Sequence, residues 1–347
     1  MSADLPQDPI DALFHWADNG VRGALAVVVK TYGSSPRPLG AMMAVSESGQ
    51  MVGSVSGGCV EGAVVQEALN ALAEGRPRLA SYGISADWAA EAGLTCGGEI
   101  EVYILPWQRD PVWSGLQSAR LDKTPAALAL GLSGRFAGEL GLFYRDGRGV
   151  GALARHRQAL HELLDAAFAE QRPRSGVVLP DGRTSVIVIP FFPPQRLIIV
   201  GAVHIAIALV RFANELGYET FVVDPRPVFA SSERFGHADH LLIAWPQEAF
   251  PELKPDAGTS IAVISHDDKL DIPALELALN SDARYIGALG SRKTMARRAA
   301  ALREAGFDDA AIARIHNPIG LDLGGRSPEE IALATIAEIV AARYGKA

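Results

Sequence analysis

The sequence predicts an α/β protein in which an N-terminal α+β domain, residues 1–190, precedes a domain with a doubly wound parallel sheet, residues 195–347. Three observations support this prediction. The 347 residues suffice for two domains of ordinary size. The stretch Phe-Phe-Pro-Pro at 191–194 is typical of a linker, because adjacent prolines fit neither a central strand nor a helix interior. After it, short apolar strands alternate regularly with helices.

The N-terminal half has a mixed pattern. Val60, Val64, Ala68 and Leu72 recur at helical spacing, which predicts a helix, and shorter apolar runs of strand length surround it. We expect helices at 9–19, 59–73 and 154–170, with strands at 24–29, 41–45, 51–55, 79–82 and 99–105 and further strands within 124–190.

The second half alternates between the two kinds of element. Its apolar runs are short enough for strands and are separated by segments with helical periodicity, which favours a parallel sheet covered on both faces. We expect strands at 196–200, 220–223, 240–244, 260–265 and 285–288, and helices at 203–216, 272–280, 292–305 and 328–344.

Composition excludes several classes of protein. Hydrophobic residues make up 48% and charged residues 21%, as in a packed globular protein. The net charge of −8 argues against a nucleic-acid or anionic-membrane partner. No apolar run has the roughly 18–20 residues that span a bilayer. Two cysteines, Cys59 and Cys96, make no disulfide framework, and residues 1–11 do not resemble a signal peptide. We therefore expect a cytoplasmic protein.

A glycine turn joins the first strand of the second domain to its first helix. The stretch Gly-Ala-Val-His-Ile-Ala at 201–206 occupies the position of the dinucleotide fingerprint, so this domain is expected to be Rossmann-like. Gly201 permits the tight turn, and the N–H groups at the helix start attract phosphate. Val203 replaces the central glycine and obstructs the approach of a pyrophosphate. The alternative is a purely structural strand-to-helix turn.

Polar residues also follow the other strands of this domain. Asp224 lies where a ribose-binding acid belongs, although a structural role in the loop explains it equally well. The loops at 266–268, 287–292 and 316–322 lie at strand ends, where open α/β sheets bind ligands. From this domain we assign the following residues to cofactor binding: Gly201, His204, Asp224, Arg226, Gly290, Arg292 and His316.

Two cysteine loops stand out in the first domain, at 54–61 and 94–99. Each places a cysteine beside a glycine pair, which can form an anion-binding nest of N–H groups. Cys59 is expected at a helix start, where the dipole favours the thiolate, a soft metal ligand and nucleophile. The alternative is that both cysteines fill tight turns. The residues assigned here are Cys59, Cys96, Gly57, Gly58, Gly97 and Gly98, with both thiols as candidate contacts for a heavy metal or for sulfur.

These motifs together resemble the XdhC/CoxI family of accessory proteins for xanthine dehydrogenase and other molybdenum hydroxylases. The resemblance is carried, in order, by GSSPRPLG (33–40), GSVSGGCVEG (53–62), LTCGG (94–98), VDPRPVFA (223–230), YIGALGSRKT (285–294), HNPIGLD (316–322) and SPEEI (327–331). The family turn usually reads Gly-Ala-Gly-His, so His204 is kept here and the central glycine is lost.

The resemblance implies a chaperone rather than an enzyme. Such a protein binds the molybdenum cofactor, as molybdopterin or its cytosine dinucleotide form, and protects it. It then supports sulfuration by a cysteine desulfurase or sulfurtransferase and inserts the cofactor into an apo molybdenum hydroxylase. An acidic protein needs focused donors for this anionic pterin phosphate, and Arg37 and Arg292 are candidates. Symmetry statistics favour a homodimer.

Other functions remain open at this stage. An NAD(P)-dependent oxidoreductase would fit the fold and Asp224, but Val203 disfavours it. A persulfide-carrying thiol enzyme and a scaffold that joins a sulfurtransferase to a hydroxylase are further alternatives. The sequence leaves open which hydroxylase is served.

Overall fold

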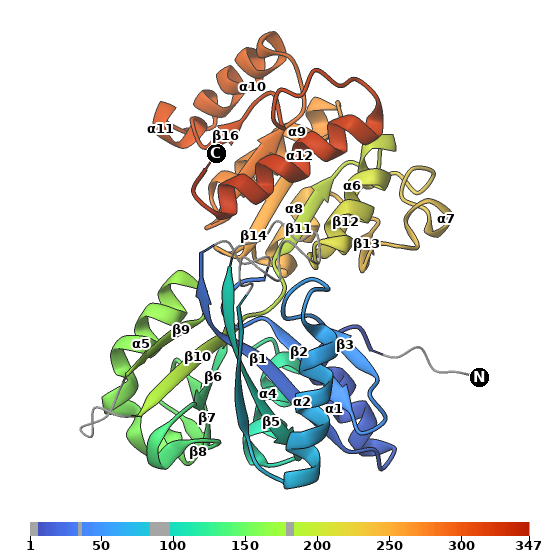
Figure 1. Ribbon diagram of the computed structural model, residues 1–347. Helices are drawn as coiled ribbons and strands as arrows, with labels where there is room; N and C mark the ends of the chain where they lie inside the picture. The colour runs from blue at the N-terminus through green and yellow to red at the C-terminus, as the bar shows by residue number, and fades with distance from the viewer. Residues whose placement is uncertain (1–5, 34–36, 84–97, 178–183, 347) are drawn as a thin grey trace. The chain divides into compact units, whose positions relative to one another are not determined.

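The structure is a computed structural model that describes residues 6–33, 37–83, 98–177 and 184–346 (Figure 1). The chain divides into two compact units, Met1–Pro193 and Pro194–Ala347. The division therefore falls between the two prolines of the Phe-Phe-Pro-Pro stretch. Each unit is described by itself below.

Within the described residues, the N-terminal unit contains two five-stranded antiparallel sheets. The first has the order β3-β2-β1-β5-β4, and the second has the order β8-β7-β6-β10-β9. The strands of the first sheet are β1 (Gly23–Tyr32), β2 (Met42–Ser46), β3 (Met51–Gly53), β4 (Arg78–Gly83) and β5 (Glu99–Trp107). Those of the second are β6 (Ala126–Gly131), β7 (Leu140–Tyr144), β8 (Gly149–Gly151), β9 (Arg174–Val177) and β10 (Ser185–Phe191).

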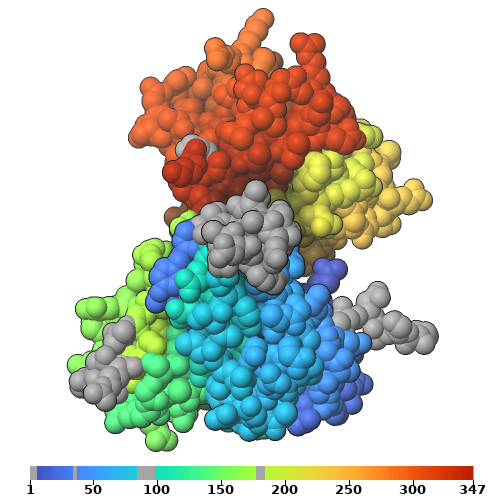
Figure 2. All heavy atoms as spheres, in the orientation of Figure 1, coloured from blue at the N-terminus to red at the C-terminus, as the bar shows by residue number. Residues whose placement is uncertain are grey.

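The alternation of side chains along β1 explains the layers of this unit. Leu25, Val27 and Val29 enter a core shared with the second sheet and with helices α1 (Pro9–Asp18) and α4 (Pro111–Leu121). The intervening Ala26 and Val28 face the other way, against helix α2 (Glu61–Glu74). Helix α5 (Arg157–Glu170) packs on the outer face of the second sheet. The solvent side of α2 is visible in the space-filling view (Figure 2).

Two helix boundaries and one whole helix differ from the prediction in this unit. Helix α2 begins at Glu61 rather than at Cys59, because the preceding residues turn around the Glu61 side chain, as described below. Helix α5 begins at Arg157, after a short 3-10 turn. Helix α4 was not expected. Its start is marked by Asp110, whose side chain accepts hydrogen bonds from two N–H groups of the first turn.

The C-terminal unit has a six-stranded parallel sheet in the order β13-β12-β11-β14-β15-β16. Counted along this unit, the order is 3-2-1-4-5-6, the Rossmann arrangement, and it confirms the predicted fold class. The strands are β11 (Arg196–Val200), β12 (Glu219–Val223), β13 (His240–Leu242), β14 (Thr259–Val263), β15 (Tyr285–Ala288) and β16 (Ile315–His316).

Helices cover both faces of this sheet. Helices α6 (His204–Glu215) and α12 (Pro328–Arg343) share a core with one face, together with the short α7 (Ser232–Phe235). Helices α8 (Pro246–Leu253), α9 (Asp268–Leu279), α10 (Arg292–Glu304) and α11 (Asp309–Ile312) pack on the other. Helix α9 begins four residues earlier than predicted, because Asp267 caps it. In the part of the chain that the structure describes, no helix is long and apolar enough to cross a membrane.

Candidate functional site

The first cysteine loop connects β3 to α2. The N–H of Ser54 still donates to the Met42 carbonyl at 3.1 Å, which ties the start of the loop to the sheet. The loop then turns around the side chain of Glu61, the first residue of α2, which is only 6% exposed. The conformation of this loop is therefore set by one carboxylate at its end.

The glycine pair of this loop is already occupied by an anion from the chain itself. The N–H groups of Gly57 and Gly58 donate to the Glu61 carboxylate at 3.1 and 2.9 Å. The N–H of Ser56 and the hydroxyl of Ser54 donate to it at 2.9 and 2.6 Å. This corrects the expectation that Gly57 and Gly58 offer free N–H groups to a ligand phosphate, because that nest is filled.

These hydrogen bonds decide the charge of Glu61. Burial acts to raise the pKa of the carboxyl, but the hydrogen bonds from Ser54 and Ser56 outweigh it and lower the pKa to about 2. Glu61 is therefore an anion at neutral pH, and it is stabilised by the same N–H groups that would otherwise attract an external anion.

Cys59 lies on the loop that Glu61 organises. It is partly exposed, and its N–H donates to the Ser56 hydroxyl oxygen at 3.0 Å. Arg37 meets the same loop, since its Nε donates to the Ser54 carbonyl at 3.2 Å. The structure thus brings Cys59 and Arg37 to one loop, as the assignment of both to one site requires.

The second cysteine loop is described only at its end. Gly98 directly precedes β5, at the end of the first sheet where β1 and β4 finish, because Tyr32 and Gly83 both pair with Glu99. Cys96 and Gly97 lie outside the described residues, so their assignment stays a prediction. Among the described residues, no group of three or more His, Cys, Asp or Glu side chains could hold a metal ion.

The Gly201 turn in the C-terminal unit is tight for a specific reason. Gly201 has φ of 110°, and a Cβ there would lie 2.6 Å from the Cα of Ser265 in the loop after β14. Neither the backbone conformation nor the contact allows a side chain. The turn therefore needs a glycine at position 201, because the loop that follows the neighbouring strand β14 leaves no room for a side chain.

Asp224 closes this turn instead of facing a ligand. Its side chain is fully buried, and its Oδ2 accepts a hydrogen bond from the Ala202 N–H at 2.8 Å. Arg226 donates to both carboxylate oxygens, through Nε at 2.8 Å and Nη2 at 2.7 Å, and its guanidinium lies over the Phe229 ring. Burial acts to raise the pKa of Asp224, but these hydrogen bonds outweigh it and lower the pKa.

The turn therefore does not fit NAD in the usual way. The carboxylate that would bind a ribose is buried and paired with Arg226, and the N–H of Ala202 is taken. Val203 precedes α6 as its N-cap without a side-chain cap, and His204 is exposed on the first turn. Asp224 and Arg226 thus contact each other, and their assignment to cofactor binding stays a prediction.

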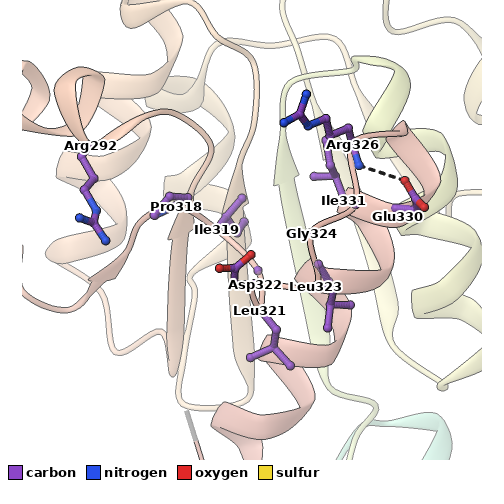
Figure 3. A pocket seen from close by; sticks show the side chains of 13 residues that line it. Arg292, Pro318, Ile319, Leu321, Asp322, Leu323, Gly324, Arg326, Glu330 and Ile331 are labelled. Atoms are coloured by element: carbon purple, nitrogen blue, oxygen red, sulfur yellow. Dashed lines mark hydrogen bonds between the residues drawn. The ribbon is translucent and has the colours of Figure 1, made fainter.

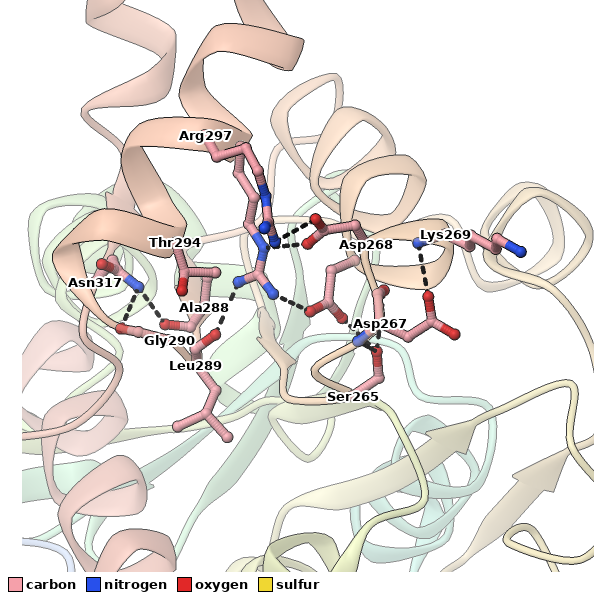
Figure 4. A network of polar contacts seen from close by, with 12 residues as sticks. Ser265, Asp267, Asp268, Lys269, Ala288, Leu289, Gly290, Thr294, Arg297 and Asn317 are labelled. Atoms are coloured by element: carbon pink, nitrogen blue, oxygen red, sulfur yellow. Dashed lines mark hydrogen bonds and ion pairs between the residues drawn. The ribbon is translucent and has the colours of Figure 1, made fainter.

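A buried polar network that the sequence did not reveal ties the next strand ends together (Figure 4). Arg298 of α10 is 1% exposed, forms an ion pair with the fully buried Asp271 of α9, and donates to the Leu289 carbonyl at 2.8 Å. Asp271 in turn accepts from the Ser265 hydroxyl at 2.6 Å. No motif marks these residues, since an arginine or aspartate in a helix is usually exposed.

The last loops of the sheet are tied in a similar way. The Asn317 side chain donates to the Gly290 carbonyl at 3.1 Å. The Nδ1 of His316 lies 3.1 Å from the Glu338 carboxylate, which also accepts from the Tyr285 hydroxyl at 2.5 Å. Burial, together with this carboxylate, raises the pKa of Tyr285. His316 and Gly290 thus support the loops that follow β15 and β16.

A cavity lies beside these loops (Figure 3). Its volume is about 520 Å³, and it is bounded by the loop after β16, the start of α12 and Arg292 at the start of α10. Arg292 is the single residue of the predicted set that lines it within the described chain.

The site residues thus fall into two groups, one on each unit. The first group is a loop with a partly exposed thiol on a rigid carboxylate-centred turn, and the second is the strand-end loops of a Rossmann sheet. Together they define a class of α/β protein that carries a cysteine loop ahead of a Rossmann-type domain.

Comparisons with known proteins agree with this class. A family model for the XdhC Rossmann domain matches residues 197–339, and one for the XdhC and CoxI family matches residues 16–83. The first range holds the strand-end loops, and the second holds Cys59. The chain belongs to the XdhC/CoxI family.

Several relatives align with nearly the whole chain. A Bacillus subtilis protein whose name describes it as a probable xanthine dehydrogenase subunit is 28% identical over 96% of this chain and 96% of its own length. The molybdenum cofactor insertion chaperone PaoD of Escherichia coli is 28% identical over 94% of this chain and 85% of its own. A Bacillus halodurans crystal structure described as a xanthine dehydrogenase has a similar fold, with a TM-score of 0.79 and 23% identity over 98% of this chain and 97% of that one.

Proposed function

We propose that this protein is a molybdenum cofactor insertion chaperone. It binds the cofactor as cargo, protects it, supports its sulfuration and inserts it into an apo molybdenum hydroxylase. One observation carries the proposal: a molybdenum cofactor insertion chaperone aligns with 94% of this chain and with 85% of its own length. An alignment of that extent includes parts of both units.

The geometry of the first unit supports this role. Cys59 is partly exposed on a loop that a buried hydrogen-bond network holds in place. Its thiol is a soft ligand, and binding it costs no conformational entropy for ordering the loop. Arg37 adds a positive charge at the same loop. Such a site can contact an anionic, sulfur-bearing cargo and still release it, because the described residues provide one thiol and no metal cage.

The finer parts of the proposal concern partners and cargo form. We expect a molybdenum hydroxylase as the acceptor and a cysteine desulfurase or sulfurtransferase as the sulfur source. The cargo is molybdopterin or its cytosine dinucleotide form. Cys96, Gly97 and Gly98 remain proposed cofactor contacts of the first unit, and Arg292 and His316 remain separately proposed contacts of the second unit.

The test is anaerobic retention of the cofactor. Purified protein is incubated with molybdenum cofactor and passed through a desalting column, and molybdenum and pterin retained per chain are measured. We expect Cys59→Ala to reduce retention at least several-fold. Ser118→Ala, at an exposed position on α4 in the same unit, should retain as much as the wild type. Cys96→Ala reports on the second thiol.

The opposite result is informative. If Cys59→Ala and Cys96→Ala both retain the cofactor and still activate an apo-hydroxylase, the thiols have no part in the function, and a scaffold that joins two partners becomes the better account. A protein that retains no cofactor in any form would overturn the proposal itself.

A further inference from the structure

Helix α12 is apolar on nearly every side. Between residues 331 and 342 its only charged residue is Glu338, and its only other polar residue is Thr335. Thr335 is fully buried, and its hydroxyl donates to the Ile331 carbonyl at 2.8 Å. Glu338 accepts hydrogen bonds from the Tyr285 hydroxyl and the Gly320 N–H inside the unit. A helix at the surface of a protein normally places polar residues on its outer side, so this composition is typical of a helix that is covered all round.

The outer side of α12 is nonetheless exposed. Leu333 and Tyr344 are 48% and 52% exposed, and Ala337 and Val340 between them are partly exposed. Successive members of this set are four, three and four residues apart, which places them along one side of the helix. Figure 2 shows the red residues of this helix at the surface of the C-terminal unit. The spacing is that of a seam between two packed helices.

The loop that precedes α12 adds to this apolar surface. The N–H of Leu321 donates to the Ala334 carbonyl at 3.1 Å, which ties the loop to the helix. Leu321 and Leu323 are both exposed, and Figure 3 shows their side chains on the loop next to α12. Large apolar side chains that gather at the surface in this way are typical of an interaction site.

The charges of α12 lie at its two ends and differ in sign. Glu329 and Glu330 stand in its first turn, where they outnumber the single positive charge of Arg326, and Arg343 and Lys346 stand at its other end. All five residues are exposed. An antiparallel helix from a second molecule would therefore bring opposite charges together at both ends, and the two helix dipoles would also oppose each other favourably.

These properties fit a second copy of the chain as the partner. A twofold axis between two antiparallel helices places the same residues on both sides of the contact, so an apolar seam meets itself. Both pairs of unlike helix ends then form at once. Ala337 lies near the middle of the seam, and its small side chain allows the two helices to approach closely.

We propose that this protein forms a homodimer through α12. The two helices lie antiparallel, the seam of Leu333, Ala337, Val340 and Tyr344 packs against the same seam of the second copy, and Glu329 lies near Lys346 of the partner subunit. The proposal goes beyond cofactor delivery, because it assigns a self-association surface to the C-terminal unit. It also gives a location to the homodimer that symmetry statistics favour.

Sedimentation velocity of the full-length protein tests this inference, over concentrations of about 1 to 100 μM. A 16-residue helix is about 24 Å long, so one helix face with two flanking leucines is smaller than a standard interface of roughly 800 Å² per partner. We therefore expect a reversible dimer with a Kd on the order of micromolar.

One substitution in the seam and one outside it locate the contact. Leu333→Glu puts a charge from each copy into the apolar seam, and it should raise the Kd of the dimer at least tenfold. Val228→Glu is the matched control, because Val228 lies in the same unit on the loop after β12 and is 85% exposed. It should change the Kd less than twofold. Thermal unfolding of both variants separates loss of the dimer from loss of the fold.

A charge exchange tests the antiparallel arrangement. Glu329→Lys and Lys346→Glu each place like charges at both ends of the pair, and each should raise the Kd about fivefold. The double variant Glu329→Lys/Lys346→Glu restores unlike pairs with reversed signs, so its Kd should return to within about twofold of the wild type. A general loss of stability would not be repaired in this way.

Three outcomes would overturn the proposal. These are a monomer at every concentration, equal effects of Leu333→Glu and Val228→Glu, or a double charge variant that associates no better than the single ones. Since no molybdenum cofactor is used, failure here leaves the chaperone proposal standing, and failure of cofactor retention leaves this one standing.

Discussion

Glu61 shows how a single side chain can change the meaning of a sequence motif. A glycine pair beside a cysteine indicates an anion-binding nest, and the nest is present, but its anion belongs to the chain. The carboxylate follows the pair by three residues, near enough to fold back onto it. The loop therefore serves to fix Cys59, and any cargo has to meet the thiol rather than the glycine N–H groups.

Replacing Glu61 should loosen this loop. Glu61→Gln removes the charge and turns an acceptor into a partial donor facing N–H groups, so we expect a loss of roughly 3 kcal/mol in the free energy of unfolding. Cys59 should also react faster with a maleimide, as measured by mass spectrometry. Glu74→Gln, on the same helix but exposed at its end, should cost less than about 1 kcal/mol. Equal stability of the two variants would contradict this role for Glu61.

The same residue predicts a pH dependence. The Glu61 pKa is about 2 in the folded protein, below the roughly 4.3 of an unperturbed glutamate. A lowered folded pKa means that its contribution is fully present above about pH 4.5 and is lost as the pH falls toward 2. Urea unfolding of wild type and Glu61→Gln between pH 6 and pH 2.5 should show the stability difference shrinking over that window, and a constant difference would refute the assignment.

Gly201 allows a second test at the residue scale. Gly201→Ala places a Cβ 2.6 Å from the Ser265 backbone and also forces alanine to φ of 110°, so we expect a loss of about 3 kcal/mol. Gly217 also has positive φ, but a Cβ there meets nothing within 4 Å. Gly217→Ala should therefore lose only about 1 kcal/mol. Urea denaturation of both variants separates the contact from the backbone strain.

At the scale of elements, the buried Arg298–Asp271 pair joins α9 and α10 to the strand ends. Arg298→Met would leave Asp271 buried without its counterion, and we expect a loss of about 3–5 kcal/mol in the free energy of unfolding. Arg297→Met removes the neighbouring exposed arginine, which pairs with Asp268, and should cost under about 1 kcal/mol.

The double variant Arg298→Met/Asp271→Leu measures how far the stability contributions of the two residues depend on each other. Removing both charges should recover much of the stability lost in Arg298→Met, because no unpaired charge remains in the interior. Equilibrium unfolding of the wild type, Arg298→Met, Asp271→Leu and the double variant gives the coupling energy. Strictly additive losses would show that the pair does not act as a unit.

Short apolar runs and helical spacing predicted several strands and helices of the second unit well. The range 196–200 and the range 285–288 are strands with the predicted bounds, and α10 and α12 end within one residue of the prediction. Helix α4 was missed although Val112, Leu116 and Ala119 recur at helical spacing and Asp110 marks its start.

The hydrogen-bond acceptors of the two glycine turns could not be predicted from periodicity. Whether Gly57 and Gly58 meet a ligand depends on Glu61, and whether Ala202 does depends on Asp224, which is 22 residues away in the sequence. A spacing pattern shows which groups can donate, but the acceptor is chosen by the fold. The Arg298–Asp271 pair is of the same kind.

At the scale of the whole molecule, the two units have separate cores. The apolar clusters of residues 10–192 and those of residues 197–342 share no member in the described chain. We therefore expect residues 194–347, expressed alone, to unfold cooperatively with a near-ultraviolet dichroism signal. A fragment that binds a hydrophobic dye and shows no unfolding transition would contradict this expectation.

Asp224 and Glu61 have one consequence for a carrier of the proposed kind. A carrier is without cargo for part of its cycle. A phosphate-binding turn without its ligand would then have oriented N–H groups with no hydrogen-bond acceptor. In this protein Glu61 in the first unit and Asp224 in the second accept hydrogen bonds from the N–H groups of their turns. These N–H groups therefore keep an acceptor after the cargo has left. The empty protein should accordingly persist as a folded species, ready to load again.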